Sequence, residues 1–168
     1  MVDGAHAPGM LELNLGTLGA SFYTGNCHKW MCAPKGAGFL YAREDQRKGL
    51  LPATVSHGLN TEPASGRSRY HHLFDWTGTD DPSARLSVPA AIDTVAELDA
   101  DGWSGVMARN HSLVVAGQEL LSEALGIEPG VPDEAIGSMA TLVLPGDSSA
   151  AFGEMDPLTV RLREEWQI

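Results

Sequence analysis

Basic residues are scarce in this sequence. Lys and Arg make up 11 of its 168 residues, against 22 Asp and Glu, so the formal net charge at pH 7 is −11. A chain of this charge repels the phosphate backbone of nucleic acids, which argues against a nucleic-acid partner. An anionic cofactor is not excluded, because a few local hydrogen-bond donors decide whether it binds.

Long apolar runs and the marks of an export signal are also missing. No apolar stretch reaches the roughly 20 residues that a bilayer-spanning helix requires. The first residues lack the basic and apolar regions of a signal peptide. Apolar residues still form 43% of the chain, enough for a packed core. We therefore expect a soluble, cytoplasmic protein without a membrane partner.

Cysteine is almost absent. Cys27 and Cys32 do not make a disulfide framework. Together with His6 and His28 they could suggest a metal hydrolase, but their spacing matches no common zinc pattern. We expect small, buried thiols in a reducing compartment and no metal. Zinc retained through dialysis would favour the alternative.

Short strands and loops are predicted for the first half of the chain. Residues 1–6 are expected to end a strand and enter a polar loop, and residues 11–18 to form a connection or helical turn. Residues 20–25 and 38–42 have strand character, with a tight turn at Pro34, Gly36 and Gly38 between them. Residues 52–85 lack periodicity, as functional loops often do, although the aromatic residues at 70–76 favour order.

Helices are predicted for the second half. Ser87 is the expected N-cap of a helix over 88–98, with Pro89 in its first turn. A longer helix over 103–125 should end at Gly126. Residues 139–144 are predicted as a strand, and a last helix should run from Asp156 to about residue 165. A domain boundary is expected near residue 85.

One of the few basic residues has an unusual setting. Lys29 follows the first full strand, between His28 and Trp30. Burial disfavours the charged form of a lysine and frees its amine to attack carbonyl groups, which is the chemistry of a Schiff-base lysine. The alternative is a lysine at a strand end whose stem packs on apolar surface while its amine reaches water.

Four motifs, in this order, resemble the class V aminotransferase family of pyridoxal-phosphate enzymes, and in particular its isopenicillin N epimerase-like subgroup. They are VDGAHAPG at 2–9, YTGNCHKWMCAPKGAGFLY at 23–41, SHG at 56–58 and WTGTDDP at 76–82. The resemblance runs from about residue 2 to residue 145. It implies an α/β fold, with part of the cofactor-binding large domain (mainly parallel sheet and helices) over 1–86. Connecting helices and the start of a small α+β domain would follow over 87–168.

The resemblance also implies roles for individual residues around a pyridoxal 5'-phosphate cofactor. Lys29 would form the Schiff base and then move the substrate's α-proton as base and acid. Asp3 would keep the ring nitrogen protonated, which makes the cofactor an electron sink. His6 would contact the 3-oxygen or the ring face. Asn26, where the family often has serine, and His28 would donate to the phosphate.

Several of these residues have plainer alternatives. Asp3 could simply cap the Asp-Gly turn, and His6 could be an ordinary loop residue. Thr79, after Gly78, resembles a threonine that reaches the phosphate held by the neighbouring subunit, which implies a homodimer with a shared active site. The remaining aromatic and histidine side chains could face the substrate or only stabilise the loop; they are His57, His71, His72 and Trp76.

The implied reaction takes place at the α-carbon of an amino acid or amino-acid-like substrate. Epimerase, aminotransferase and lyase reactions share their first steps, so all three stay open. A cysteine desulfurase needs a reactive cysteine well after the lysine, and none follows Cys32; a carbon–sulfur lyase without one is an alternative.

The resemblance further implies that the sequence holds the middle of an enzyme. We therefore expect the chain alone to bind cofactor weakly or not at all and to be inactive, and a non-catalytic fragment or pseudo-enzyme is the other alternative.

Overall fold

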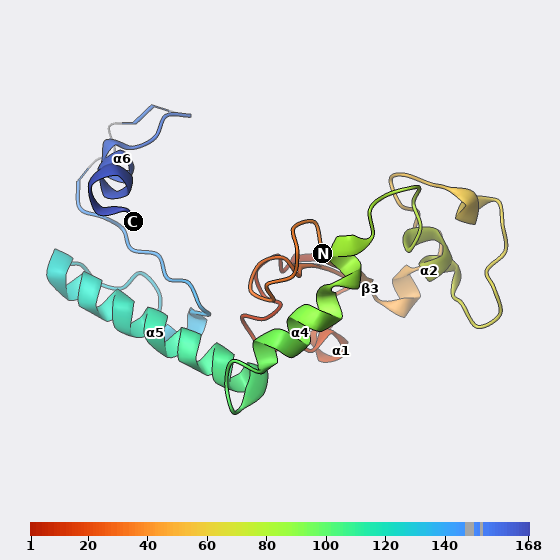
Figure 1. Cartoon of the computed structure of the whole chain (residues 1–168), viewed down its shortest axis with the longest axis horizontal. Coiled ribbons are helices and arrows are strands. Elements are labelled where there is room, and N and C mark those ends of the chain that lie inside the picture. The colour runs from red at the N-terminus through yellow and green to blue at the C-terminus, as the bar shows by residue number, and fades with distance from the viewer. Residues whose placement is uncertain (147–149, 152) are drawn as a thin grey trace. The chain divides into compact units, whose positions relative to one another are not determined.

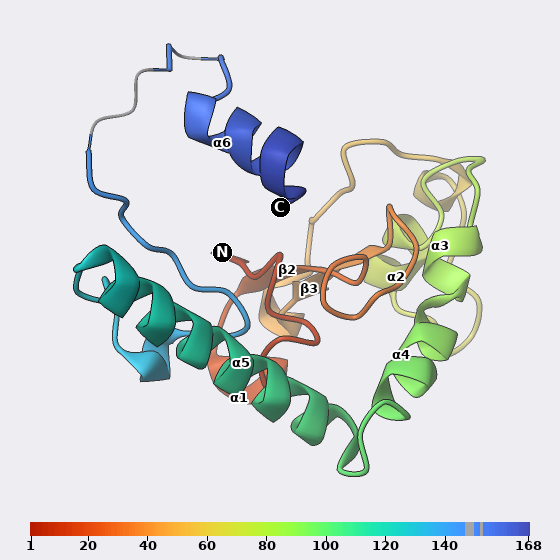
Figure 2. The same cartoon turned by 60° about the vertical axis from the view of Figure 1, so that its left-hand side comes forward.

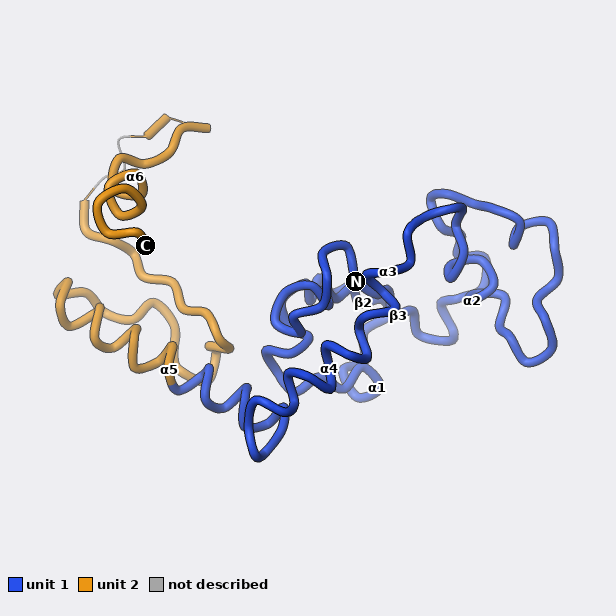
Figure 3. Tube along the Cα trace, in the orientation of Figure 1, with its two compact units in different colours: residues 1–112 blue, residues 113–168 orange. Residues whose placement is uncertain are grey.

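A computed structural model describes residues 1–146, 150–151 and 153–168 (Figure 1). The chain divides into two compact units, residues 1–112 and 113–168, which Figure 3 shows in two colours. Helix α5 (Gly102–Leu125) contributes to both units. The boundary between family domains expected near residue 86 is a different kind of division, and it stays a prediction.

The first unit contains a three-stranded sheet in the order β1-β2-β3. Strand β1 (Val2–Asp3) pairs parallel with β2 (Phe22–Asn26), and β2 pairs antiparallel with β3 (Gly38–Ala42). The parallel pair is joined by a crossover that contains the short helix α1 (Leu15–Leu18), and the antiparallel pair by the loop 27–37. The strands predicted within residues 1–6, 20–25 and 38–42 and the α/β class are confirmed, and the described sheet is mixed.

The pattern of burial explains why β2 is the central strand. Tyr23 and Gly25 point to the buried side of β2, and Tyr23 is only 2% exposed. The ring of Tyr23 stacks on that of Phe39 in β3, with centroids 6.2 Å apart. Aromatic pairs across neighbouring strands stabilise a sheet beyond the area they bury.

The aperiodic segment after β3 is ordered by side chains that bind backbone carbonyls. It contains the short 3₁₀ helices η1 (Glu44–Gln46) and η2 (His57–Leu59) and the helix α2 (Arg69–Phe74). The hydroxyl of Tyr70 donates to the Leu40 carbonyl at 2.8 Å. Arg47 lies over the Tyr70 ring and donates to the Ala42 carbonyl at 2.8 Å. The order expected around residue 70 is confirmed, because α2 is fixed to β3.

Two consecutive helices follow, and Ser87 takes the predicted N-cap position between them, with Pro89 in the first turn of the second helix, but its side chain makes no capping hydrogen bond. Helix α3 (Ser83–Leu86) leads into α4 (Val88–Ala96), as Figure 2 shows. Ser87 has a helical backbone, and its hydroxyl donates back to the Ser83 carbonyl at 2.7 Å instead of capping α4. Extended backbone is the usual conformation of an N-cap, and α3 holds Ser87 in the helical one.

Helix α5 ends as its sequence predicts. Gly126 takes a positive φ of 65°, and the amide of Ile127 donates to the Ser122 carbonyl at 3.0 Å. This is the hydrogen bond of a glycine-terminated helix. Across the part of the chain that the structure describes, none of the helices is both long and apolar enough to cross a membrane.

The second unit continues with η3 (Asp133–Ala135), α6 (Pro157–Arg161) and the π-helical turn η4 (Leu162–Trp166). Asp156 accepts a hydrogen bond from the Leu158 amide at 2.8 Å, which confirms the predicted start of the last helix. The strand predicted over 139–144 is wrong: the segment is irregular and Val143 is 79% exposed. A strand requires a hydrogen-bonded neighbour, and none of the described residues pairs with this segment.

Candidate active site

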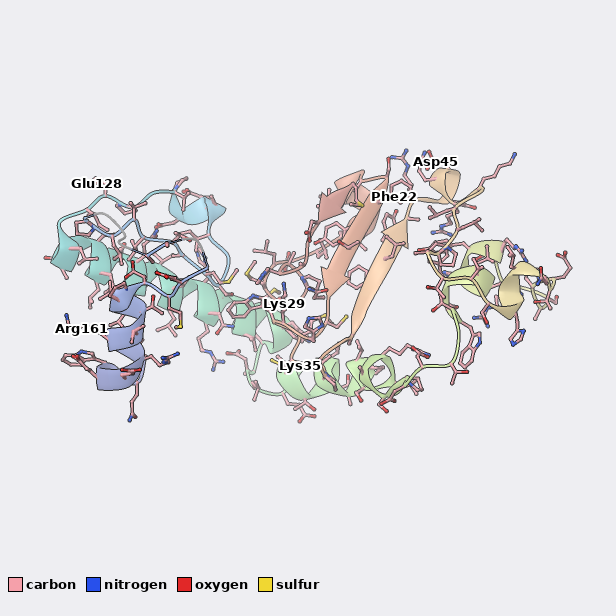
Figure 4. The ribbon with its side chains drawn as sticks, turned by 90° about the horizontal axis from the view of Figure 1, so that it is seen from above. Phe22, Lys29, Lys35, Asp45, Glu128 and Arg161 are labelled. Atoms are coloured by element: carbon pink, nitrogen blue, oxygen red, sulfur yellow. The ribbon has the colours of Figure 1, made fainter. Side chains whose placement is uncertain are left out.

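Three of the residues singled out by the sequence line one open cavity of about 520 Å³. They are Asp3, His6 and Lys29, and the rest of the lining consists of Gly4, Ala5, Ala7 and Met10. Asp3 ends β1, His6 lies in the loop after it, and Lys29 lies beyond the end of β2 (Figure 4). Because β1 and β2 are parallel neighbours, the loops that leave their carboxyl ends meet at one edge of the sheet.

The loop that carries Lys29, residues 27–37, is closed by its own backbone. The Cys27 amide donates to the Ala37 carbonyl and the Ala33 amide to the Cys27 carbonyl, both at 3.0 Å. The small side chains of these three residues are buried together, and Ala84 of α3 and Val88 and Ala91 of α4 pack against them. Lys29 is half-buried, and the loop that carries it is held by this buried cluster of small side chains.

The two loops of the site are in close contact. A Cβ built on Gly9, whose φ is +81°, would come 2.8 Å from the Met31 nitrogen and from the Trp30 carbonyl carbon. A Cβ on Gly25 of β2 would come 2.8 Å from Pro8. Glycine at positions 9 and 25 lets the loop of His6 lie directly on the loop of Lys29. The sequence shows these glycines, but nothing local indicates which backbone they approach.

Asp3 caps the turn after β1 and also lines the cavity. Its Oδ1 accepts a hydrogen bond from the Ala5 amide at 3.0 Å, so it does cap the Asp-Gly turn. Below the turn, a Cβ on Gly4 would collide with the Tyr23 hydroxyl. Burial, and after it the nearby charge of Asp3, raises the pKa of Tyr23.

Asn26 and His28, the predicted phosphate donors, lie beside the cavity. Both are described residues, and neither belongs to its lining. Asn26 ends β2 opposite Gly38. His28 is half-buried, and its Nδ1 lies 2.8 Å from the Ala37 carbonyl oxygen. A carbonyl oxygen only accepts, so Nδ1 carries the hydrogen and donates it.

The structure does not bring Thr79 to these residues within this chain. Thr79 is a described, exposed residue in the loop between α2 and α3, and it is not part of the cavity lining. It follows Gly78, whose φ is +142°.

The other candidate substrate contacts also lie elsewhere. His72 Nε2 is 2.9 Å from the Thr61 hydroxyl, and that hydroxyl donates to the His57 carbonyl at 2.8 Å, which ties the loop to α2. His71 lines a second cavity of about 500 Å³ with Phe39 and Arg85. Trp76 is 45% exposed. The two hydrogen bonds favour the loop-stabilising alternative for the 57–72 segment.

The metal alternative gains no support. Within residues 1–146, 150–151 and 153–168, no three His, Cys, Asp or Glu side chains gather where they could hold a metal ion. Cys27 is buried as expected, whereas the expectation of a buried Cys32 is wrong because that residue is exposed; both thiols are free. Burial raises the pKa of the Cys27 thiol, as expected for a small apolar residue of the core.

Comparison with known proteins decides the family. The family model described as aminotransferase class V matches residues 1–154. The chain belongs to the class V aminotransferase family. Enzymes of this family use pyridoxal phosphate, and the cavity lining contains a lysine and a carboxylate, the two groups that would hold the aldehyde carbon and the ring nitrogen of this cofactor.

Curated relatives of the chain carry two kinds of name. A protein described as a putative L-cysteine desulfhydrase 1 from Oryza sativa subsp. japonica is 38% identical over 149 residues, covering 86% of this chain and 29% of the relative. The isopenicillin N epimerase of Amycolatopsis lactamdurans is 37% identical over 161 residues, covering 90% of this chain and 40% of the relative. The chain thus spans about a third of the length of these relatives.

A solved structure supports the fold. The apo structure of the cysteine desulfurase from Thermococcus onnurineus NA1 matches 98% of this chain and 39% of its own chain, with a TM-score of 0.69 and 19% identity. At this identity the likeness concerns the fold alone, and it agrees with the α/β architecture expected from the sequence.

Proposed function

We propose that this chain is the lysine-bearing part of a pyridoxal-phosphate enzyme that acts at the α-carbon of an amino acid or amino-acid-like substrate. The observation that carries this proposal is the single open cavity lined by Asp3, His6 and Lys29. Its volume of about 520 Å³ lies within the range of small-molecule and cofactor sites.

Each residue has a distinct task in this proposal. The cofactor, when bound, supplies the electron sink that stabilises negative charge at the substrate's α-carbon. Lys29 holds the cofactor covalently and, once its amine is released, takes the proton from the α-carbon and returns it. Asp3 keeps a proton on the ring nitrogen, and His6 contacts the ring or its 3-oxygen. Asn26 and His28 bind the phosphate.

Thr79 completes the site from a second subunit in this proposal. Its exposed position, outside the cavity lining of its own chain, is compatible with a reach toward a neighbouring copy. A hydroxyl after a glycine turn offers donors that suit a phosphate. The working form is then a homodimer. The cytoplasmic location stays a prediction; one relative, from Arabidopsis thaliana, is described as chloroplastic.

The reaction that we propose first is of the epimerase type, as in the subgroup that the motifs resemble. The relatives named L-cysteine desulfhydrase match at similar identity, and this favours carbon–sulfur bond cleavage as the second candidate. Both reactions begin with loss of the α-proton to Lys29. No cysteine follows Cys32 in these 168 residues, so they hold no candidate for the sulfur-accepting cysteine of a desulfurase.

A test of the proposal compares two lysines of one loop. Lys29 lines the cavity, while Lys35 is an exposed residue of the same loop outside the lining. The chain is expressed in the longest reading frame that contains it, incubated with pyridoxal phosphate and reduced with borohydride. Peptide mass spectrometry should find the adduct on Lys29 in the parent and in Lys35→Ala, and none at that peptide in Lys29→Ala. An adduct confined to another lysine contradicts the proposal.

The substrate class is tested separately. Epimerase chemistry predicts exchange of the α-hydrogen with solvent deuterium and loss of optical purity, whereas cleavage predicts sulfide release from L-cysteine. Asp3→Asn should slow either reaction, because a neutral amide cannot keep the ring nitrogen protonated. An undiminished rate in that variant would remove Asp3 from the mechanism.

A further inference from the structure

The carbonyl oxygen of Ala37 fixes the orientation of His28. It accepts the Cys27 amide at 3.0 Å and His28 Nδ1 at 2.8 Å. Ala37 is only 1% exposed, and it is buried with Cys27 and Ala33 against α3 and α4. Breaking the first bond would leave the amide of buried Cys27 without its partner, and breaking the second would leave Nδ1 of the half-buried His28 ring without one; both losses are costly. The Nδ1 atom is therefore committed to the protein's own backbone.

This commitment decides what the other ring nitrogen can do. In a neutral imidazole one nitrogen carries the hydrogen and the other a lone pair. With the hydrogen on Nδ1, Nε2 of neutral His28 is an acceptor. A phosphate dianion also offers acceptors only, so the two cannot form a hydrogen bond until a proton is added between them.

We propose that His28 holds the cofactor phosphate as an imidazolium, so that binding of the phosphate takes up one proton at Nε2. This inference rests on the proposed function, in which His28 contacts the phosphate. Nδ1 keeps its bond to Ala37 throughout, and Nε2 becomes a charge-assisted donor. The loop then presents a positively charged donor at this position only when an anion is there to meet it.

Other ionisable groups lie on this loop and on the elements packed against it. Proton uptake by these groups has to be distinguished from proton uptake by His28. The loop itself carries Cys27, Lys29, Cys32 and Lys35. The strands, helices and loop packed against it carry Asp3, His6, Tyr23, Tyr41, Arg85 and Asp93. Of all these groups, only His6 is a second imidazole. Because His6 belongs to the proposed cofactor site, the matched control is His71→Gln, which alters an exposed histidine outside the lining of this cavity.

The test uses pyridoxamine 5'-phosphate, which has the phosphate but cannot react with a lysine. The chain is expressed in the longest reading frame that contains it, and binding is measured by calorimetry near pH 8 in buffers of different ionisation heat. An ordinary histidine is then mostly neutral and a phosphomonoester mostly dianionic. The parent should take up about one more proton than His28→Gln, whose amide donates without titrating. For each unit by which the pH rises, the affinity of the parent for pyridoxamine phosphate should fall about tenfold more than the affinity of His28→Gln.

Three results decide the matter. Nitrogen-15 NMR of the ligand-free protein should show His28 with its hydrogen on Nδ1; a hydrogen on Nε2 overturns the inference, whether or not the glutamine variant folds. Equal proton uptake in the parent and in His28→Gln overturns it while the proposed function stands. Absence of pyridoxamine phosphate binding in the parent contradicts the proposed function and this inference together. The proton uptake of His71→Gln should equal that of the parent.

Discussion

Gly9 lies directly against the backbone of Trp30. A Cβ at position 9 would stand 2.8 Å from the Trp30 carbonyl carbon and 2.9 Å from its oxygen, closer than packed atoms allow. Through this contact, the loop that carries His6 packs against the loop that carries Lys29. The spacing of the cavity between the loops therefore depends on one residue that has no side chain.

Replacing Gly9 with alanine should separate the two loops, and Gly19→Ala is its control. Both glycines have positive φ, 81° and 72°, so each alanine incurs the same left-handed strain of about 1–2 kcal/mol. Around Gly19 no heavy atom of a described residue lies within 4 Å of the added Cβ, apart from its chain neighbours. Gly9→Ala should thus lower the free energy of unfolding by about 1–3 kcal/mol more than Gly19→Ala in urea titrations, because its Cβ also overpacks the loop. Equal losses would show that the loops can move apart freely.

The two thiols should differ sharply in reactivity. Cys27 is 6% exposed and burial raises the pKa of its thiol, whereas Cys32 is exposed. Iodoacetamide attacks accessible thiolates. At pH 8 the native chain should be alkylated at Cys32 and spared at Cys27, and urea should make both react. Peptide mass spectrometry measures the two sites, and Cys32→Ser should show no alkylation without urea. Rapid alkylation of Cys27 in the native chain would contradict its burial together with Ala33 and Ala37.

Helix α3 should loosen in acid. A hydrogen bond from Arg85 lowers the pKa of Asp80, and hydrogen bonds from the Ser83 side chain and amide lower the pKa of Asp81. A carboxyl whose pKa is lower in the folded state stabilises that state above its ordinary titration near pH 4, and this contribution is lost as the pH falls further. Amide exchange over 83–87, corrected for intrinsic rates, should therefore accelerate below about pH 4. Asp81→Asn keeps an acceptor without a titrating charge, so its exchange should depend less on pH; an unchanged dependence would exclude Asp81 as a cause.

Features set by neighbouring residues were predictable from the sequence. The strand over residues 38–42, the glycine end of α5 and the Asp156 cap of α6 each depend on a few consecutive residues, and all three are confirmed. Ser87 takes the predicted cap position, but its side chain does not cap α4 because the preceding helix fixes its backbone, which no pattern after residue 87 reveals. The strand expected over 139–144 failed because pairing requires a partner, and an apolar run does not supply one.

The candidate site was predictable in its residue types but not in its contacts. Lys29 and Asp3 stand out by their setting and by the family motifs, and the parallel pairing of β1 with β2 brings them to one cavity. The Ala37 carbonyl that holds His28 lies nine residues away along the chain, and Gly9 approaches Trp30 from another loop. Such contacts come from tertiary packing, for which the sequence offers only the presence of a small residue.

Two glycines of α5 should respond differently to alanine. At Gly117 the added Cβ meets no heavy atom of a described residue within 4 Å, other than its own helix and chain neighbours. Glycine inside a helix costs about 0.5–1 kcal/mol relative to alanine, so Gly117→Ala should raise the free energy of unfolding by that amount. At Gly105 the Cβ would collide with the carboxylate of Asp99, whose Oδ1 accepts the Asp101 amide at 3.0 Å. Moving that carboxylate breaks the turn that begins α5, so Gly105→Ala should gain less or lose stability. Urea unfolding of the two variants measures the difference, and an equal gain in both would show that the turn does not hold Asp99 in place.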